Sequence, residues 1–185
     1  MPYFPLFVDL TGKDCLIVGG GAVAVRKARS LLNFGAKLRV VDPEPSASIK
    51  VLSLTLLSRP YRSPEDVTGA AMVIAATDKQ ELNRMVAQDA RAAGIPVNVV
   101  DDPQGCTFFF PALVQRGELV AGISTAGLCP RFSALLREYL DGALPPNLGE
   151  VLELLSRERQ RLSGSERIQR LDSLIVPLLT GIFVP

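Results

Sequence analysis

The chain has 185 residues, of which 48% are hydrophobic, and its formal net charge at pH 7 is +1. This length suits one main domain of ~100–150 residues with an extension. The near-neutral charge argues against nucleic acid as a partner, because nucleic-acid binders carry a strongly basic surface. The chain shows no signal-peptide pattern and no apolar run of ~18–20 residues, so we expect a cytoplasmic protein without a membrane span.

The absence of histidine restricts the chemistry. It removes the most common general base, the serine–histidine and cysteine–histidine nucleophile pairs, and most zinc sites. The three cysteines, Cys15, Cys106 and Cys129, are far apart and form no CxxC pair, which argues against a metal knuckle or a disulfide framework. We therefore expect buried thiols, no permanent metal site, and a carboxylate, lysine, tyrosine or cysteine as any acid or base.

The first part of the chain alternates between short apolar stretches and stretches of helical periodicity. CLIVGG at 15–20 and KLRVVD at 37–42 predict strands, and the stretch between them predicts a helix that ends at Gly35. Further strands are expected at SLTLLS, AMVIAAT and PVNVV, with a helix from about Lys79 to Ala93. This alternation predicts an α/β fold with a doubly wound parallel sheet and right-handed crossovers.

The pattern changes after Pro111. ALVQRGELVAGIST predicts two short strands about a turn at residues 116–118, and PRFSALLREYL predicts a helix with a proline near its start. GALPPN interrupts the chain, and EVLELLSRERQRL and ERIQRLDSLIVPLL are expected to form helices. A small mixed segment and a helical extension therefore follow the α/β domain.

Gly19, Gly21 and Ala24 give the spacing G-x-G-x-x-A where the first strand meets the first helix. The glycines let the backbone turn and approach a ligand, and Ala24 lets the helix pack near the strand. The N–H groups of the helix start, at Ala22 and Val23, can then bind a pyrophosphate. The alternative is an ordinary glycine-rich turn.

Polar residues follow two further strands of this predicted sheet. Asp42 comes 23 residues after Gly19, where a carboxylate can bind the adenosine ribose and repel a 2′-phosphate, which favours NAD over NADP. Thr77 and Asp78 follow AMVIAAT and should lie at the carboxyl edge of the sheet, where ligands of such sheets bind. Asp42 could instead be a turn residue, and Asp78 a helix N-cap.

Asp101 and Asp102 end the stretch PVNVVDD at the same edge of the sheet. Because successive residues of a strand point to opposite faces, we expect only one of the two carboxylates to face the cleft. Both could instead be loop residues before Pro103.

Taken in order, PLFVDL, CLIVGGGAVAVRKA, VIAATD, NVVD, TFFFP and ISTAGLCP resemble the dehydrogenase and ferrochelatase family of sirohaem biosynthesis. The resemblance covers about residues 3–162. That family includes the amino-terminal half of the trifunctional bacterial sirohaem synthase and the stand-alone precorrin-2 dehydrogenases. It implies a Rossmann domain at about 1–113, a dimerisation segment at 114–146 that makes a homodimer, and a helical carboxyl-terminal domain at 147–185.

The resemblance also implies an activity, which is the NAD-dependent oxidation of precorrin-2 to sirohydrochlorin. In some members the insertion of ferrous iron follows and gives sirohaem. The aspartate of NVVD, required for catalysis in the family, maps to Asp101, and the hydroxyl-rich segment that lines the active site maps to Ser124 and Thr125. Further contacts to the carboxylate-rich substrate are expected from Asn98 and from arginines suited to carboxylates, namely Arg116, Arg131 and Arg137.

This chain departs from the family pattern in two places. Ala126-Gly127 stands where a glycine pair is common, and Leu128-Cys129 stands where Thr-Ser is expected. The carboxyl-terminal part is also short. Two other functions fit part of the sequence: a nucleotide-sensing binding module, which would not need TFFFP or ISTAG, and a chelatase without redox activity. For Arg137 the alternative is a solvated helix face.

Overall fold

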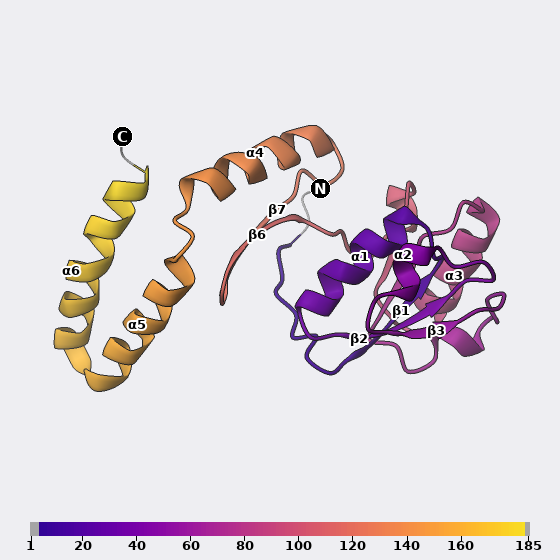
Figure 1. Cartoon of the computed structure of the whole chain (residues 1–185), viewed down its shortest axis with the longest axis horizontal. Helices are drawn as coiled ribbons and strands as arrows, with labels where there is room; N and C mark the ends of the chain where they lie inside the picture. The colour runs from indigo at the N-terminus through magenta and orange to yellow at the C-terminus, as the bar shows by residue number, and fades with distance from the viewer. Residues whose placement is uncertain (1–3, 184–185) are drawn as a thin grey trace. The chain divides into compact units, whose positions relative to one another are not determined.

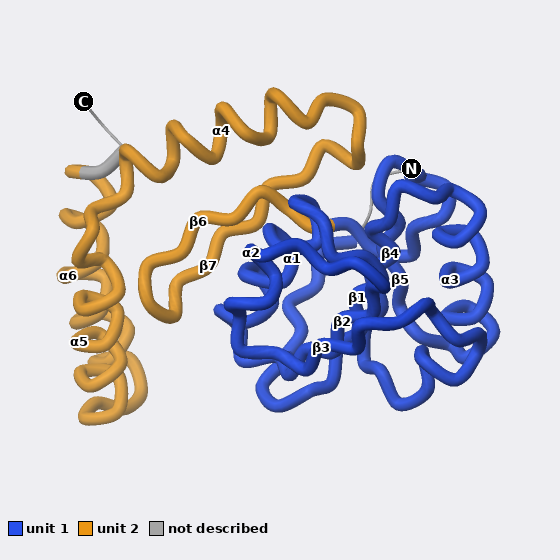
Figure 2. The backbone as a smooth tube through the Cα atoms, turned by 45° about the vertical axis from the view of Figure 1, so that its right-hand side comes forward, with its two compact units in different colours: residues 1–109 blue, residues 110–185 orange. Residues whose placement is uncertain are grey.

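A computed structural model describes residues 4–183 of the chain. The chain divides into two compact units, residues 1–109 and residues 110–185, which Figure 2 shows in different colours. The expected three-part division at 113/114 and 146/147 stays a prediction. Within the described residues, no helix combines the length and the apolar character that crossing a membrane requires.

Unit 1 is built on a five-stranded parallel sheet with the strand order β3-β2-β1-β4-β5. All five strands lie within the predicted stretches or overlap them, so the predicted α/β sheet is confirmed. The strands are β1 (Asp14–Val18), β2 (Lys37–Val41), β3 (Thr55–Leu57), β4 (Met72–Ala75) and β5 (Val97–Val99).

Two helices cover opposite faces of this sheet, as Figures 1 and 2 both show. Helix α1 (Ala22–Asn33) connects β1 to β2, and α3 (Gln80–Ala92) connects β4 to β5. The two connections run in opposite directions across the sheet, and right-handed crossovers therefore place their helices on opposite sides. The sheet is thus doubly wound. The shorter elements of this unit are α2 (Ala47–Lys50), η1 (Glu65–Val67) and η2 (Pro103–Gly105).

The local sequence explains where the first strand–helix unit begins and ends. Residues 15–18 of β1 are all buried, as expected for a parallel strand that is covered on both faces. Helix α1 ends at Asn33, and Gly35, two residues later, has a φ of 75°. The Gly35 N–H donates to the Leu32 carbonyl at 3.0 Å and the Ala36 N–H donates to the Leu31 carbonyl at 3.2 Å. This is the Schellman arrangement, which confirms the predicted end of the helix.

Two of the three cysteines are structural thiols of unit 1. Cys15 and Cys106 are buried, whereas Cys129 is exposed. Burial raises the pKa of Cys15 to about 11 and also raises the pKa of Cys106. Both thiols are therefore protonated at neutral pH, and the expectation of buried thiols is confirmed for these two.

Unit 2 begins with an antiparallel hairpin of β6 (Ala112–Arg116) and β7 (Leu119–Ile123). Its turn contains Gly117, which has a φ of 58°. Helix α4 (Pro130–Ala143) packs against the hairpin, and α5 (Leu148–Arg161) and α6 (Gly164–Phe183) pack side by side (Figure 1). The predicted hairpin and all three predicted helices are confirmed.

The loop between β7 and α4 holds a residue in an unfavourable backbone conformation. Ala126 has a φ of 52°, in the left-handed region, and it is followed by Gly127 with a φ of 81°. A Cβ in this region costs roughly 1–2 kcal/mol, which glycine avoids. The glycine pair common in the resembled family therefore matches the backbone that this loop adopts.

We predict that Ala126→Gly increases the free energy of unfolding by about 0.5–1 kcal/mol, because relief of the left-handed strain outweighs the added freedom of the unfolded chain. Urea denaturation followed by circular dichroism measures the change. Gly127→Ala is the matched control and should lower the stability by about 1–2 kcal/mol, since no atom lies within 4 Å of the added Cβ and only the backbone is strained. A destabilised Ala126→Gly protein would contradict this reading of the loop.

Candidate cofactor and catalytic site

The glycine turn after β1 lies directly against the turn after β4. Gly19 has a φ of 114°, and a Cβ added to it would lie 2.3 Å from the carbonyl oxygen of Ala76. No side chain can occupy that space, so glycine is required at position 19 by the fold itself. The Gly19 N–H also donates to the Val41 carbonyl at 2.9 Å, which joins this turn to the end of β2.

Gly21, unlike Gly19, has free space where a side chain would lie. It precedes α1 with a φ of −80°, which any residue can adopt, and no atom lies within 4 Å of an added Cβ. No side chain caps this end of α1. The space in front of the N–H groups of Ala22 and Val23 therefore suits a phosphate group. Ala24 is fully buried, as its predicted packing role requires.

Asp42 lies at the glycine turn and also supports it. Its Oδ2 accepts a hydrogen bond from the Gly20 N–H at 2.7 Å, and its Oδ1 accepts one from the Glu44 N–H at 2.7 Å. The turn-residue alternative therefore describes part of its role. A carboxylate has about four acceptor positions, so two donors leave room for the hydroxyls of a ribose.

The turn after β4 is fixed by Asn83, which the sequence analysis did not identify. Asn83 is 4% exposed. Its Oδ1 accepts hydrogen bonds from the Thr77 N–H at 3.1 Å and the Thr77 hydroxyl at 2.7 Å, and its Nδ2 donates to the Thr77 carbonyl at 3.0 Å. Asp78 is exposed, and the cap position of α3 is Lys79 instead. The N-cap alternative for Asp78 is therefore wrong.

The turn after β5 separates the two adjacent aspartates. Asp102 accepts a hydrogen bond at Oδ1 from the Gly105 N–H at 3.1 Å and so caps η2. Asp101 is exposed and has a φ of 58°, and its carboxylate makes no hydrogen bond or ion pair within residues 4–183. The expected alternation along a strand does not apply, because β5 ends at Val99. The turn distinguishes the carboxylates instead.

The thiol of Cys106 holds this turn in place. Its Sγ accepts a hydrogen bond from the Val99 N–H at 3.2 Å and lies 3.3 Å from the carbonyl oxygens of Val99 and Asp102, to which the protonated thiol can donate. A neutral thiol thus positions the backbone on both sides of Asp101. Sequence reasoning treated this cysteine only as an incidental buried thiol.

One depression brings together predicted residues from the turn after β4 and the turn after β5. It has a volume of about 610 Å³ and lies between α3 and the turn after β5. The residues that line it include Thr77, Asp78, Asn83, Arg84, Arg91, Asp101 and Asp102. The uncommitted carboxylate of Asp101 therefore shares a surface with the turn that Gly19 contacts.

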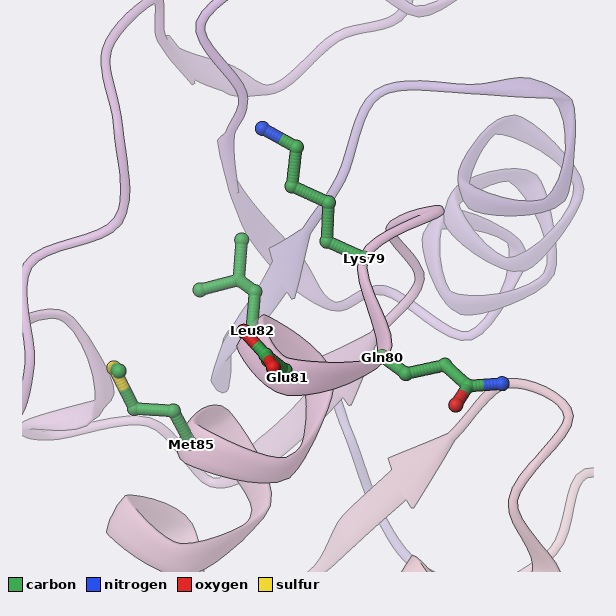
Figure 3. Close-up of a pocket in the computed structure, with 5 residues that line it drawn as sticks. All are labelled: Lys79, Gln80, Glu81, Leu82 and Met85. Carbon is green, nitrogen blue, oxygen red and sulfur yellow. The ribbon is translucent and has the colours of Figure 1, made fainter.

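A second depression of about 460 Å³ lies at the start of α3 (Figure 3). Leu82 and Met85 line it together with Lys79 and Glu81, while Gln80 points away from Leu82 and Met85. None of the residues predicted from the sequence lies in it. Thr77, Asp78 and Asp101, the predicted site residues that line either depression, all line the first one.

Asn98 was expected to contact a substrate, but its side chain is engaged inside unit 1. It is 5% exposed, and its Nδ2 donates to the Phe108 carbonyl at 3.1 Å. This bond attaches β5 to the TFFFP stretch. The amide therefore has a packing role in this structure.

The hydroxyl-bearing residues of unit 2 organise the start of α4. The Thr125 hydroxyl lies 3.1 Å from the buried Ser133 hydroxyl and accepts a hydrogen bond from the Cys129 N–H at 3.3 Å. The Ser124 hydroxyl accepts one from the Ala126 N–H at 3.1 Å. Ser133, which lies in the first turn of α4, was not identified from the sequence.

The three arginines predicted to bind substrate differ in how free they are. The Arg116 guanidinium donates to Asp141 Oδ1 at 2.9 Å and to the Asp141 carbonyl at 2.7 Å, so it caps the end of α4. The Arg137 guanidinium forms an ion pair with Glu138, with 3.5 Å between Nη2 and Oε1. Arg131 is exposed and has no ion pair in the described part of the chain. Arg131 is thus the one that keeps its charge available.

Curated proteins are similar to this chain over most of its length. It is 42% identical to the "Siroheme synthase" of Ectopseudomonas mendocina over 164 residues, which are 88% of this chain and 35% of the relative. It is 44% identical to the "Siroheme synthase" of Pseudomonas paraeruginosa over 166 residues, which are 88% of this chain and 36% of the relative. The chain thus spans about a third of the length of these relatives. The resemblance to the sirohaem family is confirmed.

A solved structure and a family model extend this result. The structure named "SirC, precorrin-2 dehydrogenase" matches with a TM-score of 0.76 and 26% identity, over 94% of this chain and 89% of that chain. The family model described as "Putative NAD(P)-binding" matches residues 6–112, which include the glycine turn, Asp42 and Asp101. Because this model covers more than half of the 185 residues, the chain belongs to this family of NAD(P)-binding proteins.

Proposed function

We propose that this chain is an NAD-dependent dehydrogenase that oxidises precorrin-2 to sirohydrochlorin, a step of sirohaem synthesis. The observation that carries the proposal is Asp101, a carboxylate without a partner in the described residues, held by a left-handed turn at the edge of a sheet whose glycine turn is open to a phosphate. Strained residues that the surrounding structure fixes are frequent at active sites. The structural similarity to a precorrin-2 dehydrogenase supports the proposal.

Different residues of unit 1 bind the cofactor and take part in the reaction. The N–H groups of Ala22 and Val23 would hold the pyrophosphate, and Asp42 would accept hydrogen bonds from the adenosine ribose. NAD supplies the acceptor for a hydride. The oxidation removes one hydride and one proton from precorrin-2, and Asp101 takes the proton. Positioning of the two reactants supplies most of the remaining rate.

We predict that the purified chain converts precorrin-2 and NAD to sirohydrochlorin and NADH, and that Asp101→Asn lowers the turnover number by about 10²–10⁴-fold while NAD affinity is kept. Asp102→Asn is the matched control. It should stay within a few-fold of wild type, because the amide oxygen of asparagine can still accept the hydrogen bond from Gly105. Absorbance of sirohydrochlorin and of NADH measures both variants.

The outcomes of this assay separate the three functions. NAD binding without any product from the wild type would favour the nucleotide-sensing module. Sirohaem formed from sirohydrochlorin and ferrous iron, without NADH formation from precorrin-2, would favour a chelatase that lacks redox activity. Unaffected turnover in Asp101→Asn would mean that positioning alone carries the oxidation.

The preference for NAD over NADP is part of the same proposal. Residues 43–49 contain no arginine or lysine to receive a 2′-phosphate, and Glu44 adds a second carboxylate beside Asp42. A 2′-phosphate would therefore meet like charge without a cation.

We predict that calorimetry gives a dissociation constant for NADP at least about tenfold higher than for NAD, because repulsion between like charges in a partly buried site costs more than ~1.4 kcal/mol. Gly21→Ala should fold with wild-type stability, because its Cβ meets no protein atom, yet it should bind both cofactors more weakly. Equal affinities for the two cofactors would refute the role given to Asp42.

The proposal also concerns ferrous iron as a substrate and the cytoplasm as the location of the reaction. Within residues 4–183, no group of three or more metal-ligating side chains was found. If iron is inserted, it arrives as a substrate, and Asp101 is the carboxylate placed to take protons from the pyrrole nitrogens. NAD is an intracellular cofactor, so we place the reaction in the cytoplasm.

We also propose a homodimer formed through the segment from about Ala112 to Leu140. Of residues 110–181, Val114 and Ser133 alone are buried, so unit 2 has little core of its own. Phe132, Leu135 and Tyr139 are exposed at helical spacing along α4, and Leu128 is exposed just before the helix. Leu136 and Leu140 of the predicted apolar face are half-buried. Such an apolar stripe fits a second copy of the chain.

We predict that the wild type sediments as a dimer and that Leu135→Asp shifts it to the mass of one chain, because a carboxylate would be buried in the interface. Met85→Asp on α3 is a matched control that should stay dimeric, since Met85 is 46% exposed and Leu135 is 47% exposed. A wild-type mass of one chain at every concentration would contradict the proposal.

A further inference from the structure

One face of α3 forms a polar wall of the depression that contains Asp101. Gln80, Arg84, Gln88 and Arg91 follow one another at intervals of four, four and three residues, which places them on one side of the helix. All four line the depression. With a rise of ~1.5 Å per residue, this row extends over roughly 16 Å of the helix. The opposite wall is the turn that carries Asp101 and Asp102.

The two arginines of this wall have different roles. The Nη2 of Arg91 donates a hydrogen bond to the Gln104 carbonyl at 2.7 Å and so ties α3 to the opposite wall. Arg84 is exposed, and its guanidinium has no hydrogen bond or ion pair within the described residues 4–183. It directly follows Asn83 and lies one turn along α3 from Gln80.

Three carboxylates share the depression with Arg84. Asp78, Asp101 and Asp102 line the same depression, yet none forms an ion pair with Arg84. A guanidinium presents its donors in a fork that fits a carboxylate in two hydrogen bonds. A ligand with a carboxylate at its periphery and an acidic proton further in would therefore meet Arg84 with the first and Asp101 with the second.

We propose that Arg84 determines substrate specificity by binding a peripheral carboxylate of the tetrapyrrole. This inference rests on the proposed function, because it assigns the substrate of Asp101 to the same depression. It also differs from the sequence-based expectation, which placed all carboxylate-binding arginines in residues 116–137.

The test is steady-state turnover of precorrin-2 by the full chain and by Arg84→Gln. The KM for precorrin-2 should rise about tenfold, the lower end of what a hydrogen bond to a charged group contributes, because the site is open to water. The turnover number and the dissociation constant for NAD should stay within about twofold of wild type. Arg84→Lys keeps the charge but not the fork, and its KM should fall between the two.

Arg29→Gln on α1 is the matched control, because Arg29 is an exposed helical arginine of the same unit and lies away from the depression. Its KM should equal that of the wild type. Raising the KCl concentration from about 0.05 to 0.5 M should increase the wild-type KM and change the KM of Arg84→Gln less, because one screened ion pair has been removed.

A binding measurement keeps this inference separate from the proposed function. The dissociation constant for sirohydrochlorin, measured by fluorescence without turnover, should rise by the same factor in Arg84→Gln. If the wild type neither oxidises precorrin-2 nor binds sirohydrochlorin, both proposals fail. If the wild type is active and Arg84→Gln has an unchanged KM, or loses turnover number without a change in KM, the role of Arg84 is refuted and the proposed function stands.

Discussion

The arrangement of the site depends on the contact between Gly19 and the backbone of Ala76. This contact leaves no space for a side chain. Because β1 and β4 are neighbours in the sheet, it brings the turn that begins α1 against the turn that begins α3. The hydrogen bond from the Gly20 N–H to Asp42 then attaches the turn after β2. The turns after β1, β2 and β4, which are distant in sequence, thus lie together at one edge of the sheet. Gly21, beside which there is free space, lies at this edge just before α1.

Polar side chains that look available in the sequence divide into two groups in the structure. Asn83, Asp102 and the Cys106 thiol have their hydrogen bonds inside unit 1 and fix the loops. Asp101 and Arg84 have no partner in the described residues and line the depression that those loops form. The first group provides a rigid support, and the second provides groups that a ligand can reach. Such a division is what precise placement of reacting atoms requires.

Features that depend on local periodicity and turn chemistry were predictable from the sequence. The strand–glycine turn–helix unit, its end at Gly35, the hairpin around Gly117 and the position of Asp42 all follow from short stretches of residues. Features that depend on partners far along the chain were not predictable. Nothing near Arg116 in the sequence indicates that its guanidinium caps α4 through Asp141, 25 residues later. The distinction between Asp101 and Asp102 was expected from a strand, but a turn held by Cys106 provides it.

We propose that the cofactor binds at the edge formed by the glycine turn, Asp42 and the turn after β4. The most direct measurement is the set of amide chemical-shift changes in ¹⁵N-labelled protein when NAD is added. We expect the largest changes at Gly20, Ala22 and Val23, with further changes around Asp42 and Thr77. Changes confined to the depression at Leu82 and Met85 or to α5 and α6, with none at the glycine turn, would contradict it.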